Sequence, residues 1–186
     1  MRLLANQFAS LRYPLSLLLL CSSLSVFVLR ATAQADERGF IVQVGQPMPA
    51  FTLTDLKGNQ YSNESLRGTT YVLQFTASWC GVCRKEMPHL EKDVWQAFRD
   101  RSFTLLGVDL DEPKEKVATF AASTGVTYPM APDSEGQVFY SIAGPKTGVT
   151  RNVVVDSTGK IVFLTRLFDS AEFAEMIQLI DRLTEN

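Results

Sequence analysis

Cys80 and Cys83 are the residues of this chain whose type and spacing could do chemistry. They enclose Gly81 and Val82 in a CxxC motif, in which one thiolate attacks a disulfide of another molecule and the second thiol resolves the mixed disulfide. The same motif also occurs as half of a zinc site or as a static structural disulfide. A zinc site needs four ligands, and this chain has no second CxxC motif and one histidine, His89. The motif therefore favours a redox-active pair, and we expect neither a metal nor a cofactor.

The elements around the motif place Cys80 where a sulfur becomes reactive. Residues 71–77 (YVLQFTA) are rich in β-branched and aromatic side chains and predict a strand, and a helix is predicted from the motif to about Arg99. Cys80 would then begin a helix, whose partial positive charge and unpaired N–H groups stabilise a thiolate. We expect the pKa of Cys80 to lie below the usual value of about 8.5. Pro88 should kink this helix one turn after Cys83.

The rest of the chain alternates strands with helices. Strands are predicted at 103–108, 128–132, 152–155 and 160–164, and helices from Pro113 to Gly125, at 137–142 and from Asp169 or Ser170 onward. This order predicts an α/β domain with a central sheet that helices cover on both faces. The acidic cluster from Asp109 to Glu112 is expected to be a solvated loop, because its oxygen atoms are too few for a calcium site.

The first 33 residues have the pattern of a secretory signal peptide. Arg2 and Arg12 give a basic leader, residues 15–29 form an apolar run, and Ala33 ends a stretch of small residues suited to cleavage. The alternative is an uncleaved anchor that tethers the protein to a membrane through residues 13–30. We therefore expect a periplasmic or otherwise exported protein with one domain at residues 34–186, which keeps two of the three cysteines.

Composition excludes other classes of protein. The chain has 186 residues, 46% of them hydrophobic and 20% charged, which is too apolar for a disordered protein. Its formal net charge of −2 gives no basic surface for nucleic acid, so we expect no nucleic-acid partner.

Residues 79–88 (WCGVCRKEMP), the lead-in at 44–53 and the hairpin around 153–159 resemble the thioredoxin-like TlpA/ResA group of thiol–disulfide oxidoreductases, in the AhpC/TSA–redoxin superfamily. The resemblance covers most of residues 44–184. It implies that the domain at residues 34–186 has a thioredoxin fold with a central mixed sheet, an extra N-terminal β-hairpin and an inserted segment at about 110–135. It also implies protein disulfide or dithiol substrates, a membrane thiol electron donor and a role as reductant, in cytochrome c maturation or disulfide repair.

Three further site residues follow from comparing the chain with this group. Trp79 is expected at the rim of the active site, in contact with substrate. Gln74 stands where thioredoxins have a buried acid, which leaves Glu86 as the candidate catalytic carboxyl beside Cys80 and Cys83. The alternative is that Glu86 is a solvated acid favoured by the helix dipole. Thr150 occupies the place of the group's cis-proline, which faces the sulfurs and the substrate.

The peptide bond before Thr150 is expected to be trans, because a cis bond before a residue other than proline costs about 2.5–4 kcal/mol. Pro145 is the alternative cis site if the loop is longer.

A peroxiredoxin-like thiol peroxidase is the alternative function. The run from Thr150 to Asn152 resembles peroxiredoxin relatives, in which an arginine helps hold the reactive thiolate, and Arg151 would be that residue. Those enzymes also share a Pro-x-x-x-Thr-x-x-Cys motif. Counted back from either Cys80 or Cys83, this chain has neither the proline nor the threonine at the required positions.

Overall fold

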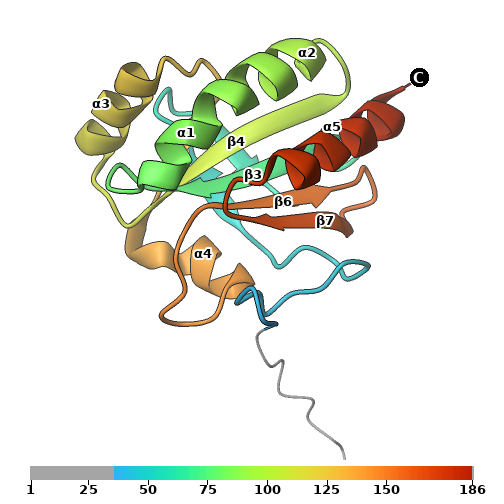
Figure 1. The fold of residues 1–186 in the computed structure, drawn as a ribbon, viewed down its shortest axis with the longest axis horizontal. Coiled ribbons are helices and arrows are strands. Elements are labelled where there is room, and N and C mark those ends of the chain that lie inside the picture. The colour runs from blue at the N-terminus through green and yellow to red at the C-terminus, as the bar shows by residue number, and fades with distance from the viewer. Residues whose placement is uncertain (1–35, 186) are drawn as a thin grey trace, which may run out of the picture. The chain divides into compact units, whose positions relative to one another are not determined.

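The computed structural model describes residues 36–185, which form a five-stranded mixed sheet with helices on both faces (Figure 1). The strand order is β5-β4-β3-β6-β7. The pairs β3–β4 and β4–β5 are parallel, whereas β6 runs antiparallel to both β3 and β7. The strands are β3 (Thr70–Thr76), β4 (Phe103–Leu110), β5 (Met130–Asp133), β6 (Arg151–Val155) and β7 (Ile161–Arg166). The predicted fold class is confirmed, and the predicted signal peptide or anchor at 1–33 lies outside the described residues.

The helices cover the two faces through two separate apolar clusters. The helices are α1 (Gly81–His89), η2 (Leu90–Trp95), α2 (Gln96–Phe98), α3 (Lys114–Thr124), η3 (Ser134–Gly136), α4 (Gln137–Ile142) and α5 (Ser170–Thr184). One cluster joins the sheet to α1, η2, α2, α3 and α5, and the other joins it to α4 and the segment before the first strand. Because both faces are covered, β3 is buried along its whole length. No helix within residues 36–185 is both long enough and apolar enough to span a bilayer.

Two additions surround the central sheet. Strands β1 (Thr52–Thr54) and β2 (Gln60–Ser62) pair antiparallel and form the expected extra N-terminal hairpin. The segment at about 110–135 contributes α3 and the edge strand β5 between β4 and α4. These additions leave the carboxyl end of β3 next to the start of α1, where the CxxC motif lies.

The helix that follows the CxxC motif changes its hydrogen-bonding register directly after Pro88. It is α-helical through His89, continues as a π-helix in η2, and returns to an α-helix in α2. At the end of the π segment, the N–H of Gln96 donates to the carbonyl of Glu91, five residues earlier. Proline has no N–H to donate, so an irregularity near Pro88 is the expected consequence.

Candidate active site

Cys80 and Cys83 form a disulfide at the junction between β3 and α1. Their Cα atoms are 5.3 Å apart, within the usual range for a disulfide. Cys80 is the N-cap residue of α1, and its sulfur accepts a hydrogen bond from the N–H of Cys83 at 3.2 Å. Cys80 is 7% exposed and Cys83 is 0% exposed. Of the two sulfurs, Cys80 is therefore the one that another molecule can reach first.

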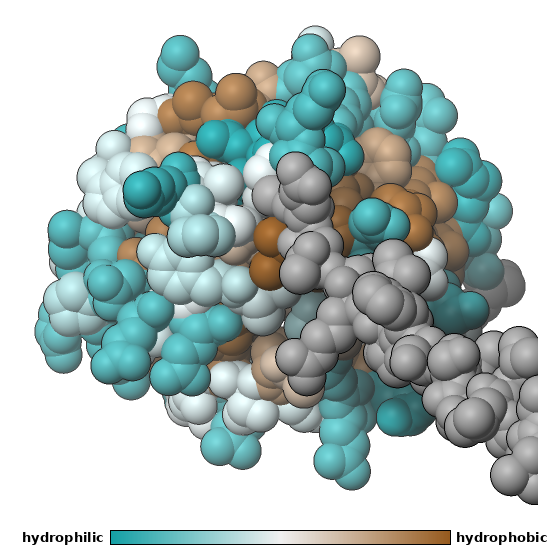
Figure 2. All heavy atoms as spheres, turned by 90° about the horizontal axis from the view of Figure 1, so that it is seen from below, coloured by the Kyte–Doolittle hydropathy of each residue, from teal (hydrophilic) through white to brown (hydrophobic). Residues whose placement is uncertain are grey.

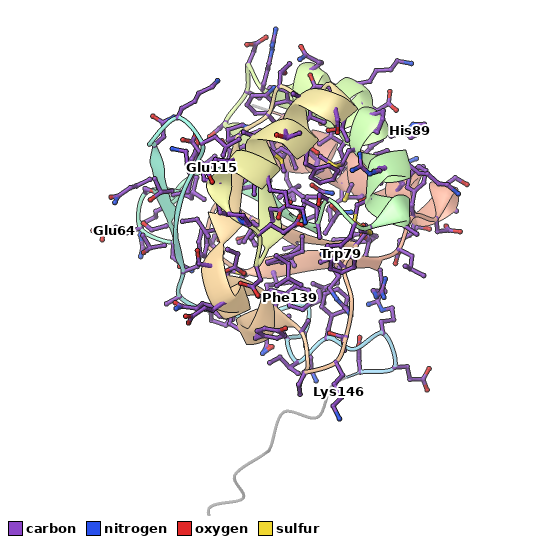
Figure 3. The ribbon with its side chains drawn as sticks, turned by 90° about the vertical axis from the view of Figure 1, so that its left-hand side faces the viewer. Glu64, Trp79, His89, Glu115, Phe139 and Lys146 are labelled. Atoms are coloured by element: carbon purple, nitrogen blue, oxygen red, sulfur yellow. A yellow bond between two sulfur atoms is a disulfide. The ribbon has the colours of Figure 1, made fainter. Side chains whose placement is uncertain are left out.

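Exposed apolar side chains stand next to this disulfide. Trp79 directly precedes Cys80 and is 62% exposed, so its indole offers an apolar surface beside the sulfurs (Figure 3). Leu167 is also exposed, and its backbone N–H donates to the carbonyl of Thr150 at 3.1 Å. Trp79 is thus exposed directly before Cys80, and its contact with substrate stays a prediction.

Thr150 faces both sulfurs, but the prediction for its peptide bond is wrong. The Val149–Thr150 bond is cis, and it is the sole cis bond in the described part of the chain, so Gly144–Pro145 is not the cis site. Thr150 is fully buried, and its hydroxyl lies 3.6 Å from the sulfur of Cys80 and also contacts that of Cys83. The expectation rested on the local preference for trans. In the fold Thr150 contacts both cysteines and Leu167, which are tertiary contacts that the local preference does not include.

Glu86 is buried next to the motif rather than solvated, so the interpretation as a surface acid is wrong. It is 1% exposed, and its carboxylate accepts a hydrogen bond from the side-chain amide of Asn152 at 2.7 Å. That amide also donates to the hydroxyl of Thr165 at 2.9 Å. Burial raises the pKa of Glu86 to about 7, against the lowering effect of the hydrogen bond from Asn152. Glu86 can therefore gain or lose a proton close to neutral pH.

The neutral residue Gln74 lies in the same buried network. The hydroxyl of Tyr128 donates to its amide oxygen at 3.4 Å. Three other polar atoms of the network have no protein partner among residues 36–185: Nε2 of Gln74, Oε2 of Glu86 and Oδ1 of Asn152. Unpaired buried polar atoms are costly, and here they concentrate around the ionisable carboxyl of Glu86.

Two further acids, Asp109 and Glu112, are buried, and the prediction of a solvated loop is wrong. Both residues are buried, at 0% and 6% exposure. The carboxylate of Glu112 accepts hydrogen bonds from the backbone N–H and the hydroxyl of Ser78, at 2.6 and 2.7 Å. From the other side, Arg84 donates two hydrogen bonds to the carbonyl of Ser78, at 2.8 and 3.2 Å. Ser78 is therefore fixed at three of its polar atoms.

The two carboxyls of this pair have opposite pKa shifts. Burial, followed by the negative charge of Glu112, raises the pKa of Asp109 to about 8. Burial alone would also raise the pKa of Glu112, but hydrogen bonds from Lys116 and Ser78 outweigh it and lower the pKa to about 2. At neutral pH Asp109 is therefore mostly protonated, and Glu112 is the ionised partner that binds Ser78. Sequence reasoning missed Glu112, because its contacts join β4 to a loop more than thirty residues away.

Replacing Glu112 with glutamine should loosen the loop that carries Trp79 and Cys80. Glutamine keeps one acceptor for Ser78 but loses the negative charge that pairs with Lys116, and charge-assisted hydrogen bonds are about twice as strong as neutral ones. We expect the rate at which reduced Cys80 attacks a disulfide to fall about tenfold. Stopped-flow measurement with a small aromatic disulfide gives this rate.

The matched control is Glu115→Gln, an exposed acid in the first turn of α3 that makes no side-chain contact with the loop (Figure 3). It should leave the rate unchanged. Equal rates for Glu112→Gln and the control would contradict the role of Glu112.

Arg151, the residue considered for a peroxidase, contacts a backbone carbonyl and an aromatic ring. The Nε of Arg151 donates to the carbonyl of Gly148 at 3.0 Å, and its guanidinium stacks on Phe40. No hydrogen bond joins it to either sulfur within the described part of the chain. Between residues 36 and 185, no three His, Cys, Asp or Glu side chains lie close enough together to hold a metal ion.

Comparison with known proteins gives the same picture of a disulfide-exchanging domain. Residues 44–164 match the AhpC/TSA family. The chain is 33% identical over 122 residues to the thiol-disulfide oxidoreductase ResA of Geobacillus kaustophilus, which covers 64% of this chain and 67% of the relative. A solution structure from Bacteroides thetaiotaomicron, of a protein proposed to be a protein disulfide isomerase, has a TM-score of 0.77 and 50% identity over 80% of this chain and 94% of that one. The thioredoxin domain of a thiol-disulfide oxidoreductase from Bacteroides vulgatus has a TM-score of 0.64 and 26% identity, covering 77% and 99% of the two chains.

Proposed function

The chain belongs to the AhpC/TSA family, and from this premise we propose that it is an exported thiol–disulfide oxidoreductase that reduces disulfides of other proteins. The observation that carries the proposal is the Cys80–Cys83 disulfide at the N-terminus of α1, with its more exposed sulfur next to Trp79. The name of the Geobacillus relative, a thiol-disulfide oxidoreductase, supports it.

The exchange has two steps, and electrons balance across them. The thiolate of Cys80 attacks one sulfur of the substrate disulfide, which forms a mixed disulfide and releases the other substrate sulfur as a thiolate. The thiolate of Cys83 then attacks the sulfur of Cys80, which closes the Cys80–Cys83 disulfide and releases the second substrate thiol. The substrate gains two electrons and the protein loses two. A dithiol donor restores the reduced protein by the reverse sequence.

The residues around the disulfide have separate parts in this scheme. The N-terminus of α1 stabilises the thiolate of Cys80 through its partial positive charge and the N–H of Cys83. The hydroxyl of Thr150 contacts both sulfurs and can donate to whichever is negative. Trp79 offers the apolar contact for the substrate. Glu86, with a pKa near neutrality, takes up and returns the proton that Cys83 must lose before the second step.

Export follows from the first 33 residues, whose basic, apolar and small-residue segments have the order of a signal peptide. If the segment is retained, residues 13–30 act as a membrane tether. In either case the domain works outside the cytosol and takes its electrons from a membrane thiol donor. The direction of exchange, reduction rather than oxidation, agrees with a role in cytochrome c maturation or disulfide repair.

Two measurements test this function. The reduced protein should reduce the interchain disulfides of insulin, with dithiothreitol as the electron source, and the insulin should precipitate. Equilibration of the Cys80–Cys83 pair with glutathione should give a reduction potential well below about −200 mV, as expected for a reductant. A potential near about −120 mV would refute the direction of exchange. A failure to exchange with insulin or any peptide disulfide would refute the function itself.

A further inference from the structure

Arg151 is the largest side chain that the fold buries completely, and most of its hydrogen-bonding capacity is unused. Its Nε donates to the carbonyl of Gly148 at 3.0 Å, and the guanidinium lies over the ring of Phe40, 4.4 Å from the ring centre. Nη1 and Nη2 donate to no protein atom within residues 36–185. Burial, followed by the charge of Arg166, lowers the pKa of Arg151 to about 10, so the group is still positively charged at neutral pH.

Arg151 borders an open cavity of about 500 Å³, and its Nη1 and Nη2 are buried beneath the cavity surface. The charged groups around the cavity are Glu37, Arg38, Lys146, Arg151 and Arg166. Arg38 is paired with Glu172 at 3.0 Å and lies 3.6 Å from Asp36, which compensates its charge. Neither Lys146 nor Arg166 forms an ion pair with any acid of the described chain. The cavity therefore has an excess of positive charge, although the whole chain is slightly acidic.

Two glycines leave this cavity open next to the guanidinium. Gly39 has a φ of +81°, and a Cβ atom there would lie 3.0 Å from Nη2 of Arg151 and 2.6 Å from the side chain of Thr147. A Cβ atom at Gly148 would make only an ordinary contact, 3.6 Å from Nη2 of Arg166. The carbonyl of Gly148 accepts the hydrogen bond that orients Arg151. Figure 3 labels Lys146 at this end of the molecule, below Trp79, and the face drawn in Figure 2 carries hydrophilic residues together with hydrophobic patches.

The cavity is connected to the active site through consecutive residues. Thr150, whose hydroxyl contacts both sulfurs, directly precedes Arg151. The carbonyl of Thr150 accepts a hydrogen bond from Arg166 at 3.4 Å and one from the backbone N–H of Leu167 at 3.1 Å, and both residues border the cavity. A polypeptide held at Cys80 would therefore pass within a few residues of the cavity.

We propose that this cavity binds an acidic side chain of the protein substrate, close in sequence to the substrate's disulfide. The carboxylate would lie over the buried positive charge of Arg151, whose Nη1 and Nη2 have no acceptor within residues 36–185. Lys146 and Arg166 would attract it. The proposal rests on the proposed function. It gives the protein a preference for acidic substrates, which the CxxC motif by itself does not predict.

Two peptide disulfides that differ at one position test the charge preference. One has aspartate beside its cysteine and the other has asparagine, and each is mixed with reduced protein at low ionic strength. Quenching with an alkylating reagent and separation of the products give the second-order rate constant for each peptide. We expect the aspartate peptide to react about five times faster or more with the native chain, because complementary charge raises association rates.

Substitutions then assign the preference to the cavity. Lys146→Glu changes an exposed rim residue and should lower the ratio of the two rates to about one or below. Arg151→Gln should lower the ratio in the same way. If that variant fails to fold, the ratio measured for Lys146→Glu still tests the site. The control is Lys92→Glu, which makes the same charge change on an 85% exposed lysine of η2 and should keep the native ratio.

The outcomes separate this proposal from the function on which it rests. Equal rates for the two peptides with the native chain, or an unchanged ratio in Lys146→Glu, would overturn the acidic-side-chain site while leaving disulfide exchange intact. If the ratio of the two rate constants fell as much in Lys92→Glu as in Lys146→Glu, the proposal would also be overturned, because the effect would then reflect overall charge. If neither peptide oxidises the protein, the proposed function itself fails.

Discussion

Replacing Cys83 with serine should convert the protein from a catalyst into a trap. Cys80 would still attack a substrate disulfide, but no second thiol could release the mixed disulfide, so covalent complexes should accumulate. Turnover with insulin should fall on the order of a thousandfold or more, because the resolving nucleophile is gone. Non-reducing electrophoresis after acid quench shows the trapped complexes as bands that disappear with dithiothreitol.

The matched variant is Cys80→Ser, which changes the other half of the same motif. It should be just as inactive in turnover, yet form few mixed disulfides, because Cys83 is completely buried while Cys80 is partly exposed. This asymmetry separates a redox pair from a static disulfide, in which neither variant would capture a partner. Equal trapping by both variants would contradict the assignment of Cys80 as the attacking sulfur.

The part of the site that is local in sequence could be predicted from the sequence. Cys80 and Cys83 belong to one motif, and the strand and helix that present them have strong patterns of their own, so the position of Cys80 at the start of α1 follows from local rules. The spacing of Glu86 from Cys83 predicts a carboxyl on the same face of the helix, and Glu86 is a buried residue of α1. The alternation of strands and helices was sufficient for the sheet architecture, because each element is several residues long and amphipathic or fully apolar.

The parts that the sequence did not predict depend on contacts between distant segments. The bond before Thr150 is cis against its local preference, and Thr150 contacts a cysteine 70 positions earlier in the chain. Glu112 looks like a surface acid in sequence, but it binds Ser78 across the end of the sheet. Arg151 has an apolar neighbourhood on one side and a charged one on the other, which no pattern in β6 indicates. In each case tertiary packing decided the environment of a polar residue.

Replacing Glu86 with glutamine should stabilise the protein at high pH and change the pH dependence of its chemistry. The folded state raises the pKa of Glu86 from 4.5 to about 7. A carboxyl with a raised pKa favours the folded state fully below pH 4.5, and this contribution is lost as the pH rises through about 7. Above that pH the buried charge costs about 3 kcal/mol, at 1.36 kcal/mol for each pKa unit. Glutamine carries no charge at any pH, so it avoids this cost.

We therefore expect the free energy of unfolding of Glu86→Gln to exceed that of the native chain by about 1–3 kcal/mol at pH 8. At pH 4.5, where glutamate and glutamine are both neutral in the folded state, the difference should nearly vanish. Denaturant titrations of the oxidised proteins at several pH values give these free energies. Asp109, whose pKa is also raised, titrates alike in both proteins and cancels from the difference.

The same substitution should slow the second step of exchange near neutral pH, because Cys83 would lose the carboxyl that accepts its proton. The rate of release of a preformed mixed disulfide at Cys80 should then rise with pH without the inflection near pH 7 that Glu86 gives the native chain. Glu175→Gln, an exposed acid of α5, is the control and should keep both the native stability profile and that inflection. An inflection near pH 7 that persisted in Glu86→Gln would contradict the role of Glu86 in proton transfer, while a stability difference independent of pH would contradict its raised pKa.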